Sequence, residues 1–299
     1  MIVVELMGGL GNQLFQYAAG KSLAYKSKSE LYVDARFLMN RNVESRKVTY
    51  RNYDLDIFKI NPPLAAASAS LRYGISASLV FRPVKRLFNR FINAGPLQYV
   101  AERRPYQYDV QFGDLTDNVY LSGYWQSTQY FQAIQQQLRA ELQFAESIPA
   151  YASELAEEIK SNLSSVCVHV RRSDFINNRR HDVVPPVYYQ EAEKLILARV
   201  NSPTFYVFSD DIEWCRTHIR FCAPTVFVGD EWAGNRAQLH LQLMTFCQHF
   251  IIPNSTFGWW AAWLSPGLNK IVVVPKKWAY VHQSFIGSDE LIYPGWLTI

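Results

Sequence analysis

The chain has 299 residues, of which 49% are hydrophobic, and its mean hydropathy is −0.12; this is the composition of a folded globular protein large enough for two domains. The formal net charge of +4 is too small to indicate a nucleic-acid-binding protein, although it suits an anionic ligand. The four cysteines form no CxxC pair and no Cys/His cluster with zinc spacing, so we expect reduced thiols, no zinc site of this type and a cytoplasmic location.

The first elements in chain order are a strand, a glycine loop, a helix and a second strand. "IVVEL" (2–6) is typical of a buried strand, "MGGLG" follows it as a tight loop, and a helix is expected from about Asn12. A second strand, "ELYV" (30–33), ends at Asp34. This order predicts the start of a βαβ unit, whereas residues 36–118 are irregular.

The second half of the chain alternates regularly between strands and helices, after a strand in "NVYLSGYW" (118–125) and a helix in "TQYFQAIQQQLRAEL" (128–142). Such alternation predicts a parallel sheet covered on both faces. The expected fold class is α/β, with Rossmann-like domains at 1–150 and 151–299. The expected strands are 166–170, 204–208, 225–228, 249–252 and 271–274, and the expected helices are 151–161, 187–199, 211–219 and 236–247.

Concentrated charge follows the buried strand in "VCVHVRRSDF" (166–175). Ligands of parallel sheets bind beyond the carboxyl ends of the strands, and alternation along a strand places His169 and Arg171 on one face and Arg172 on the other. The planar guanidinium of Arg171 suits a diphosphate. The alternative is a structural network of Arg172 and Asp174 with His169 in the core; we favour binding for Arg171 and a structural role for Arg172.

Two further strand ends carry polar side chains. In "FYVFSDD", Asp210 is placed to accept from a ribose hydroxyl or a guanine edge, or else Ser209 or Asp210 caps the next helix. Asn254, Ser255 and Thr256 stand between a strand and an aromatic-rich helix, whose N-terminus would bind an anion or be capped by these hydroxyls. The three loops are expected at one edge of the C-terminal domain.

Several stretches together resemble a known family. They are "GGLGNQLFQYA" (8–18), "HVRRSDF" (169–175), "FSDD" (208–211), "CQHFIIPNSTFGWWAAWL" (247–264) and "VVPKKW" (273–278). The set is similar to glycosyltransferase family 11, the α-1,2-fucosyltransferases. The resemblance implies a GT-B architecture of two facing Rossmann-like domains. It also implies inverting, metal-independent transfer of fucose from GDP-L-fucose to O2 of a terminal galactose in a glycan.

The resemblance also implies roles for individual residues. His169 and Arg171 would contact GDP, with Arg171 neutralising the leaving diphosphate, and Asp210 would read the nucleoside. Asn254, Ser255, Thr256 and Phe257 would line the phosphate and base pocket of the donor site. Gly11, Asn12 and Gln13 would close over the pyrophosphate and the fucose from the N-terminal domain.

The catalytic base is the least determined of the expected site residues. Asp174 follows the donor-site arginine, and His181 and Asp182 lie on the loop beyond it. A base must come within hydrogen-bonding reach of the acceptor hydroxyl. Asp174 is therefore the first candidate, His181 and Asp182 are the others, and a mechanism led by departure of the diphosphate would need none.

Two other classes of protein compete with this interpretation. Gly9 and Gly11 fit the dinucleotide-binding pattern GxGxxG, with Asp34 at the right distance for an NAD-dependent oxidoreductase, but Leu14 occupies the third glycine position. A non-catalytic sugar-binding module would not need an arginine at a strand end. "DLD" (54–56) resembles the DxD of metal-dependent glycosyltransferases, but it follows a polar segment, so we interpret it as ordinary inter-element structure.

The segment 79–92, "LVFRPVKRLFNRFI", has an apolar helical face and a basic one. Such a helix either lies on an anionic membrane, here the inner face, or buries its apolar face in its own domain. Both interpretations stay open.

Overall fold

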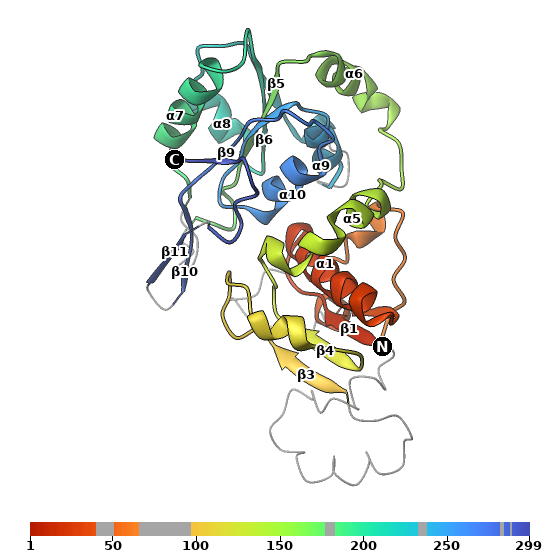
Figure 1. Ribbon diagram of the computed structural model, residues 1–299. Coiled ribbons are helices and arrows are strands. Elements are labelled where there is room, and N and C mark those ends of the chain that lie inside the picture. Colours follow the sequence, from red (N-terminus) through yellow and green to blue (C-terminus); the bar gives the residue numbers. More distant parts are fainter. Residues whose placement is uncertain (40–50, 66–96, 177–182, 233–237, 282–283, 288) are drawn as a thin grey trace. The chain divides into compact units, whose positions relative to one another are not determined.

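The computed structural model describes residues 1–39, 51–65, 97–176, 183–232, 238–281, 284–287 and 289–299 (Figure 1). The chain divides into two compact units, Met1–Glu141 and Leu142–Ile299, so the division falls earlier than the expected one after residue 150. The segment 79–92, His181 and Asp182 lie outside the described residues. Within the described ranges, no helix is long and apolar enough to cross a bilayer.

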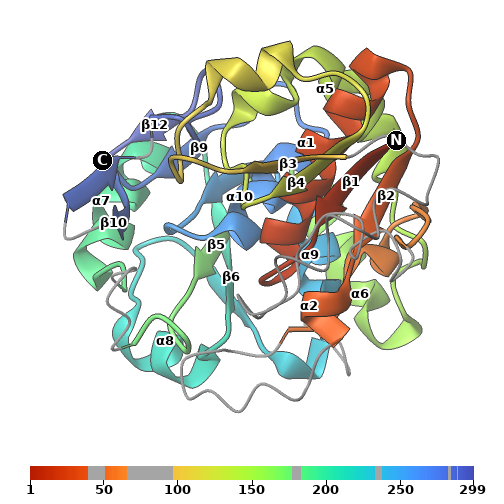
Figure 2. The same ribbon diagram turned by 90° about the horizontal axis from the view of Figure 1, so that it is seen from below.

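The N-terminal unit is built on a parallel sheet with the strand order β2-β1-β4-β3. The chain passes from β1 to β2 on one side and then returns through β3 and β4 on the other, so the strand order reverses between β1 and β4. The long helix α1 packs against β1 and β2 (Figure 2). The strands are Ile2–Glu5 (β1), Leu31–Asp34 (β2), Gln98–Ala101 (β3) and Val119–Ser122 (β4), and the helices are Leu10–Ser27 (α1), Arg36–Met39 (α2) and Gln135–Glu141 (α5).

The helix expected over 128–142 is shorter than predicted. Two 3-10 turns, Thr128–Tyr130 and Gln132–Ile134, precede α5. Phe131 between them has φ −131° and ψ 10°, which is not helical. This break lets both Tyr130 and Phe131 bury their rings, each about 2% exposed or less. Core packing therefore overrides the helical pattern here.

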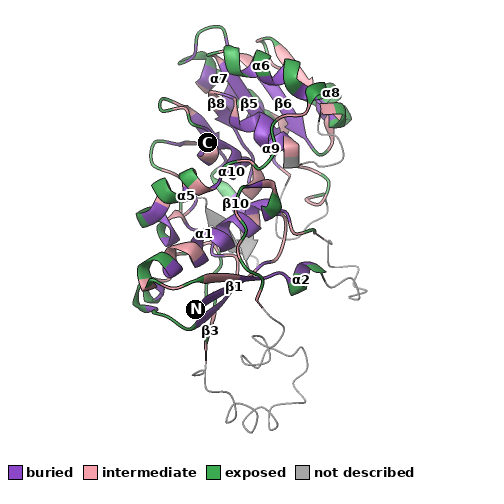
Figure 3. Ribbon diagram, turned by 90° about the vertical axis from the view of Figure 1, so that its right-hand side faces the viewer, coloured by how far each residue is buried: buried purple, intermediate pink, exposed green. Residues whose placement is uncertain are grey.

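The C-terminal unit is built on a parallel sheet with the order β12-β9-β8-β5-β6-β7. Its central strands are largely buried (Figure 3). The strands are Ser165–Val170 (β5), Thr204–Ser209 (β6), Thr225–Val228 (β7), His249–Ile251 (β8), Val272–Val274 (β9) and Leu297–Thr298 (β12), with Lys277–Val281 (β10) and Ser284–Gly287 (β11) as a separate antiparallel pair. The helices are Ser153–Ser161 (α6), Pro186–Leu197 (α7), Ile212–His218 (α8), Gln238–Thr245 (α9) and Thr256–Leu264 (α10).

Helices cover both faces of this sheet. Side chains of α7 and α8 pack with Val166, Val168 and Val170 of β5 on one face. On the other face, His169 of β5 packs against Gly258 of α10. Phe208 of β6 packs edge-on against the imidazole of His240 on α9. The expected α/β class with Rossmann-like parallel sheets is confirmed. Because β5 leads to β6 and β7 on one side and β8 lies on the other, the strand order reverses between β5 and β8.

Candidate active site

The carboxyl ends of β5 and β8 flank the position where the C-terminal strand order reverses. Open parallel sheets bind ligands in the crevice at such a switch point. The segment that follows β5 begins with Arg171, and the segment that follows β8 leads through Asn254 and Ser255 into α10. The topology therefore brings two of the three predicted loops to one place, and β6, beside β5, brings the third.

His169 is a buried residue of this crevice rather than an exposed one. Its side chain packs against Phe257 with ring centroids 5.6 Å apart, and among the described residues no group forms a hydrogen bond with Nδ1. Burial, reinforced by the charge of Arg171 and by His240, lowers the pKa of His169 to about 3. The imidazole is therefore neutral at physiological pH and offers one donor and one acceptor nitrogen.

Arg171 is held by two carboxylates. Its Nη2 lies 2.7 Å from Oδ1 of Asp174, and its Nη1 lies 3.1 Å from Oδ2 of Asp210. The Nε atom also donates to Asp174, over 2.8 Å. The side chain stays 22% exposed. A guanidinium orientated in this way at a strand end can receive an anionic ligand, which must compete with the carboxylates.

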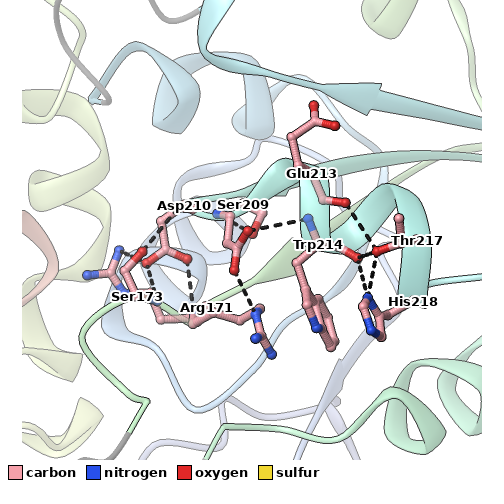
Figure 4. A network of polar contacts seen from close by, with 10 residues as sticks. Arg171, Ser173, Ser209, Asp210, Glu213, Trp214, Thr217 and His218 are labelled. Atoms are coloured by element: carbon pink, nitrogen blue, oxygen red, sulfur yellow. Dashed lines mark hydrogen bonds and ion pairs between the residues drawn. The ribbon is translucent and has the colours of Figure 1, made fainter.

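Asp210 fixes the loop that carries Arg171. Its Oδ1 accepts from the amide of Arg172 over 2.8 Å, and its Oδ2 accepts from the amide of Ser173 over 3.0 Å (Figure 4). The expected cap of α8 is not Ser209 or Asp210. Asp211 caps the helix, with its carboxylate accepting from the amide of Trp214 over 3.3 Å. Asp210 is left to hold the segment after β5.

Arg172 lies on the opposite face from His169, as alternation along the strand predicts. Its guanidinium lies 3.6 Å from the ring centroid of Trp214 on α8, and its Nε donates to Asp211 over 3.0 Å. These contacts suit the structural role expected for Arg172. The alternative interpretation placed Asp174 in a network with Arg172, but Asp174 pairs with Arg171.

The N-terminus of α10 lies beside the imidazole of His169. A Cβ at Gly258 would lie 2.6 Å from Nδ1 of His169, so backbone and ring are in close contact. Ser255 is the N-cap residue, but its side chain makes no capping hydrogen bond, which leaves the capping alternative unsupported. The Nδ2 atom of Asn254 donates to the carbonyl of Trp278 over 3.0 Å and anchors the loop. Amides at an uncapped helix N-terminus bind anions well.

The donor-site residues predicted in the N-terminal unit form hydrogen bonds with neighbouring loops of that unit. Gln13 is fully buried: its Nε2 donates to the carbonyls of Gly8 (3.0 Å) and Asn52 (2.7 Å), and its Oε1 accepts from the amide of Asp54 (3.0 Å). Gly11 is buried in the first turn of α1. Asp54 of "DLD" is therefore a buried inter-element residue, and no metal-type cluster occurs in the described part of the chain.

Other amide side chains of this network were not predicted. Gln16 accepts from the amide of Met7 over 3.0 Å and donates to the carbonyl of Gly123 over 3.1 Å. Gln126 donates to Oδ1 of Asn12 over 2.8 Å. The position of Gln16, one turn after Gln13 on α1, was an available signal. The amides of α1 thus tie together the loops that follow β1 and β4.

The model of the glycosyl transferase family 11 matches residues 88–299, which is most of the chain. The chain belongs to glycosyltransferase family 11. This membership replaces the oxidoreductase and sugar-binding-module interpretations. Asp34, the acidic residue of the dinucleotide-binding pattern, already accepts hydrogen bonds from Arg36 and Tyr120, which agrees with this result.

Proteins similar to this chain carry the names of glycosyltransferases. An α-1,2-colitosyltransferase of Escherichia coli is 29% identical over 93% of this chain and 92% of its own length, and the O-antigen biosynthesis glycosyltransferase WbnK of Escherichia coli is 29% identical over 98% and 99%. The galactoside α-(1,2)-fucosyltransferase 1 of Leontocebus fuscicollis is 33% identical over 52% of this chain and 46% of its own. Fucosyltransferase NodZ from Bradyrhizobium superposes with a TM-score of 0.45, at 16% identity over 89% and 92% of the two chains.

Proposed function

We propose that this family-11 glycosyltransferase moves L-fucose from GDP-L-fucose to O2 of a terminal galactose in a glycan, with inversion and without a metal ion. The observation that carries the proposal is the meeting of Arg171, His169 and the N-terminus of α10 at the switch point of the C-terminal sheet. The names of the relatives, which are α-1,2-fucosyl- and α-1,2-colitosyltransferases, support the sugar and the linkage.

The C-terminal unit would bind the donor. Arg171 would meet the diphosphate, and the amides at the start of α10, with Ser255, Thr256 and Phe257, would line the phosphate site. As the bond between the sugar and the diphosphate breaks, negative charge develops on the leaving oxygen. A fixed guanidinium and fixed amides stabilise that charge more in the transition state than in the ground state.

Asp210 contributes by holding Arg171 and the adjacent amides in place. A contact of Asp210 with the nucleoside remains a prediction, as do contacts of Gly11, Asn12 and Gln13 with the pyrophosphate and fucose. The N-terminal unit would serve the acceptor side. The cytoplasmic location and a membrane contact through 79–92 also remain predictions.

The names of the relatives leave two donor sugars, because colitose is L-fucose without its 3-hydroxyl group. A site that forms hydrogen bonds with a hydroxyl rejects the analogue that lacks it by a large factor, whereas a site that leaves it in solvent does not. The test is transfer from GDP-L-fucose and from its GDP-linked 3-deoxy analogue to lactose, N-acetyllactosamine and the type 1 disaccharide. The linkage and anomer of each product would be determined by NMR.

We expect an α-1,2-linked product from GDP-L-fucose with at least one of these galactosides. Transfer from the 3-deoxy donor alone would correct the donor sugar and leave the site intact. Absence of transfer from both donors to every galactoside would overturn the proposal.

A further inference from the structure

Glu5 ends β1 at the switch point of the N-terminal sheet. It pairs in register with Asp34 at the end of β2, and on the other side Ser122 ends β4. The hydroxyl of Ser122 donates to Oε2 of Glu5 over 2.6 Å. Because the strand order reverses between β1 and β4, this pair lies where an open parallel sheet receives its ligand. The glycine loop starts two residues further on.

The other carboxylates that end strands of this sheet are fully engaged. Asp34 is 3% exposed, and its oxygens accept from the amide and guanidinium of Arg36 and from the hydroxyl of Tyr120. Glu102, after β3, accepts from the amide of Tyr124 with one oxygen and from the amide of Trp125 with the other. Both groups act as structural acceptors.

Glu5 differs from both residues in its hydrogen bonding, and it differs from Asp34 in its exposure as well. Within the described part of the chain, Ser122 is its hydrogen-bond donor, and the side chain is partly exposed. Burial raises the pKa of Glu5, and the charge of Asp34 raises it further; the hydrogen bond from Ser122 and the charge of Arg36 oppose them. A carboxylate with a raised pKa is a stronger base than an ordinary one.

The carboxylates after β5 and β6 are paired with arginines. Asp174 and Asp210 both pair with Arg171, and Asp211 pairs with Arg172. Their surroundings suit the role of counter-ions for the arginines.

We propose that Glu5 is the general base of the transfer reaction, a role that rests on the proposed function. Its carboxylate takes the proton from the acceptor hydroxyl. The hydroxyl oxygen forms a bond to the anomeric carbon of the donor sugar as the bond from that carbon to the diphosphate oxygen breaks. The electron pair of that bond leaves with GDP, and protonated Glu5 later releases its proton to water.

The experiment measures kcat and kcat/KM from pH 4.5 to pH 8.5 for the wild type, Glu5→Gln, Glu5→Asp and Ser122→Ala. Glu30→Gln is the matched control, because Glu30 also accepts from a hydroxyl, that of Tyr32, but at the amino end of β2. We expect Glu5→Gln to lower kcat by about 10²- to 10⁴-fold. Wild-type kcat/KM should rise with pH through the raised pKa of Glu5, and Glu5→Gln should lack this rise.

Ser122→Ala gives a second readout. Removal of a hydrogen bond that favours the charged form should raise the pKa of Glu5. The acid limb of the pH–rate profile should therefore move to higher pH in Ser122→Ala, whereas the acid limb of Glu30→Gln should match that of the wild type. Stability separates a base from a structural residue. Since burial disfavours ionised Glu5, the neutral isostere Glu5→Gln should unfold at the same temperature as the wild type at pH 7, or higher.

A Glu5→Gln enzyme with wild-type kcat and an unchanged acid limb would overturn the proposal. So would a loss of activity that follows a lowered unfolding temperature and spares Glu5→Asp, because that result assigns a structural role. Failure of the proposed function is separate: it would appear as absence of transfer by the wild type.

Discussion

Gly258 lies so close to His169 that a Cβ at position 258 would be 2.6 Å from Nδ1 of the imidazole. The same Cβ would be 3.3 Å from Cβ of Ile252, so it has no room to move away from the ring. The first turn of α10 and the end of β5 are thus packed backbone against side chain. This contact lies beside the end of β5, where we place the diphosphate.

Gly258→Ala is therefore expected to displace His169 and to weaken GDP binding. Overpacking of a filled core typically costs about 1–3 kcal/mol. Gly267→Ala is the control, since its Cβ would meet its nearest atom at an ordinary 3.5 Å. Chemical denaturation and calorimetric titration with GDP would check both variants. Equal stability and GDP affinity in Gly258→Ala and Gly267→Ala would show that the contact does not define the site.

Asp174→Asn is expected to bind GDP more tightly than the wild type. The substitution removes one of two negative charges beside Arg171, so an incoming diphosphate meets less competition. We expect a gain of about threefold to tenfold, on the order of 1 kcal/mol. Asp211→Asn is the control, because it alters the partner of Arg172 and keeps an N-cap residue. Weaker GDP binding by Asp174→Asn would show that Asp174 is needed to orientate Arg171.

The low pKa of His169 predicts a loss of stability in mild acid. The pKa is lowered from 6.5 to about 3 in the folded state, so the unfolded chain takes up a proton below pH 6.5 that the buried ring refuses. This one group should cost on the order of 2 kcal/mol at pH 5 relative to pH 7. Urea denaturation at both values should show a smaller difference for His169→Gln. An identical pH dependence in wild type and variant would contradict a neutral His169.

Transfer activity is expected to survive EDTA. In the proposed mechanism, Arg171 and the amides at the start of α10 meet the charge of the diphosphate, so a divalent cation has no required part. The measurement is the initial rate with and without EDTA, followed by addition of manganese. Loss of turnover that manganese restores would indicate that "DLD" (54–56) or Asp210 binds a metal ion.

Much of this architecture could be predicted because periodicity reports burial directly. The strands β1, β5, β6 and β7 lie within a residue of their expected positions, since continuous apolar runs bounded by turns are typical of parallel strands. The face of Arg172 followed from simple alternation along β5. Where the core requires rings on successive residues, as at Tyr130 and Phe131, the helical pattern misleads.

The polar contacts of the site were harder to predict than its position. Which of Ser209, Asp210 and Asp211 caps α8 depends on backbone angles that sequence does not specify. The engagement of Asp210 with Arg171 depends on register between β5 and β6, which is a long-range property. Glu5 could not be predicted as a site residue, because a single carboxylate in a strand forms no motif. Its position beside the strand-order reversal of the N-terminal sheet is what suggests a role for it.

The most direct test of the account is steady-state kinetics of Arg171→Lys against Arg172→Lys, with circular dichroism to confirm folding. Arg171→Lys keeps the charge but loses the planar fork. We expect kcat to fall about 10²- to 10³-fold, with a smaller change in donor KM. Arg172→Lys, on the opposite face, should retain most of its kcat. Normal turnover by folded Arg171→Lys would contradict the account and place the diphosphate away from the end of β5.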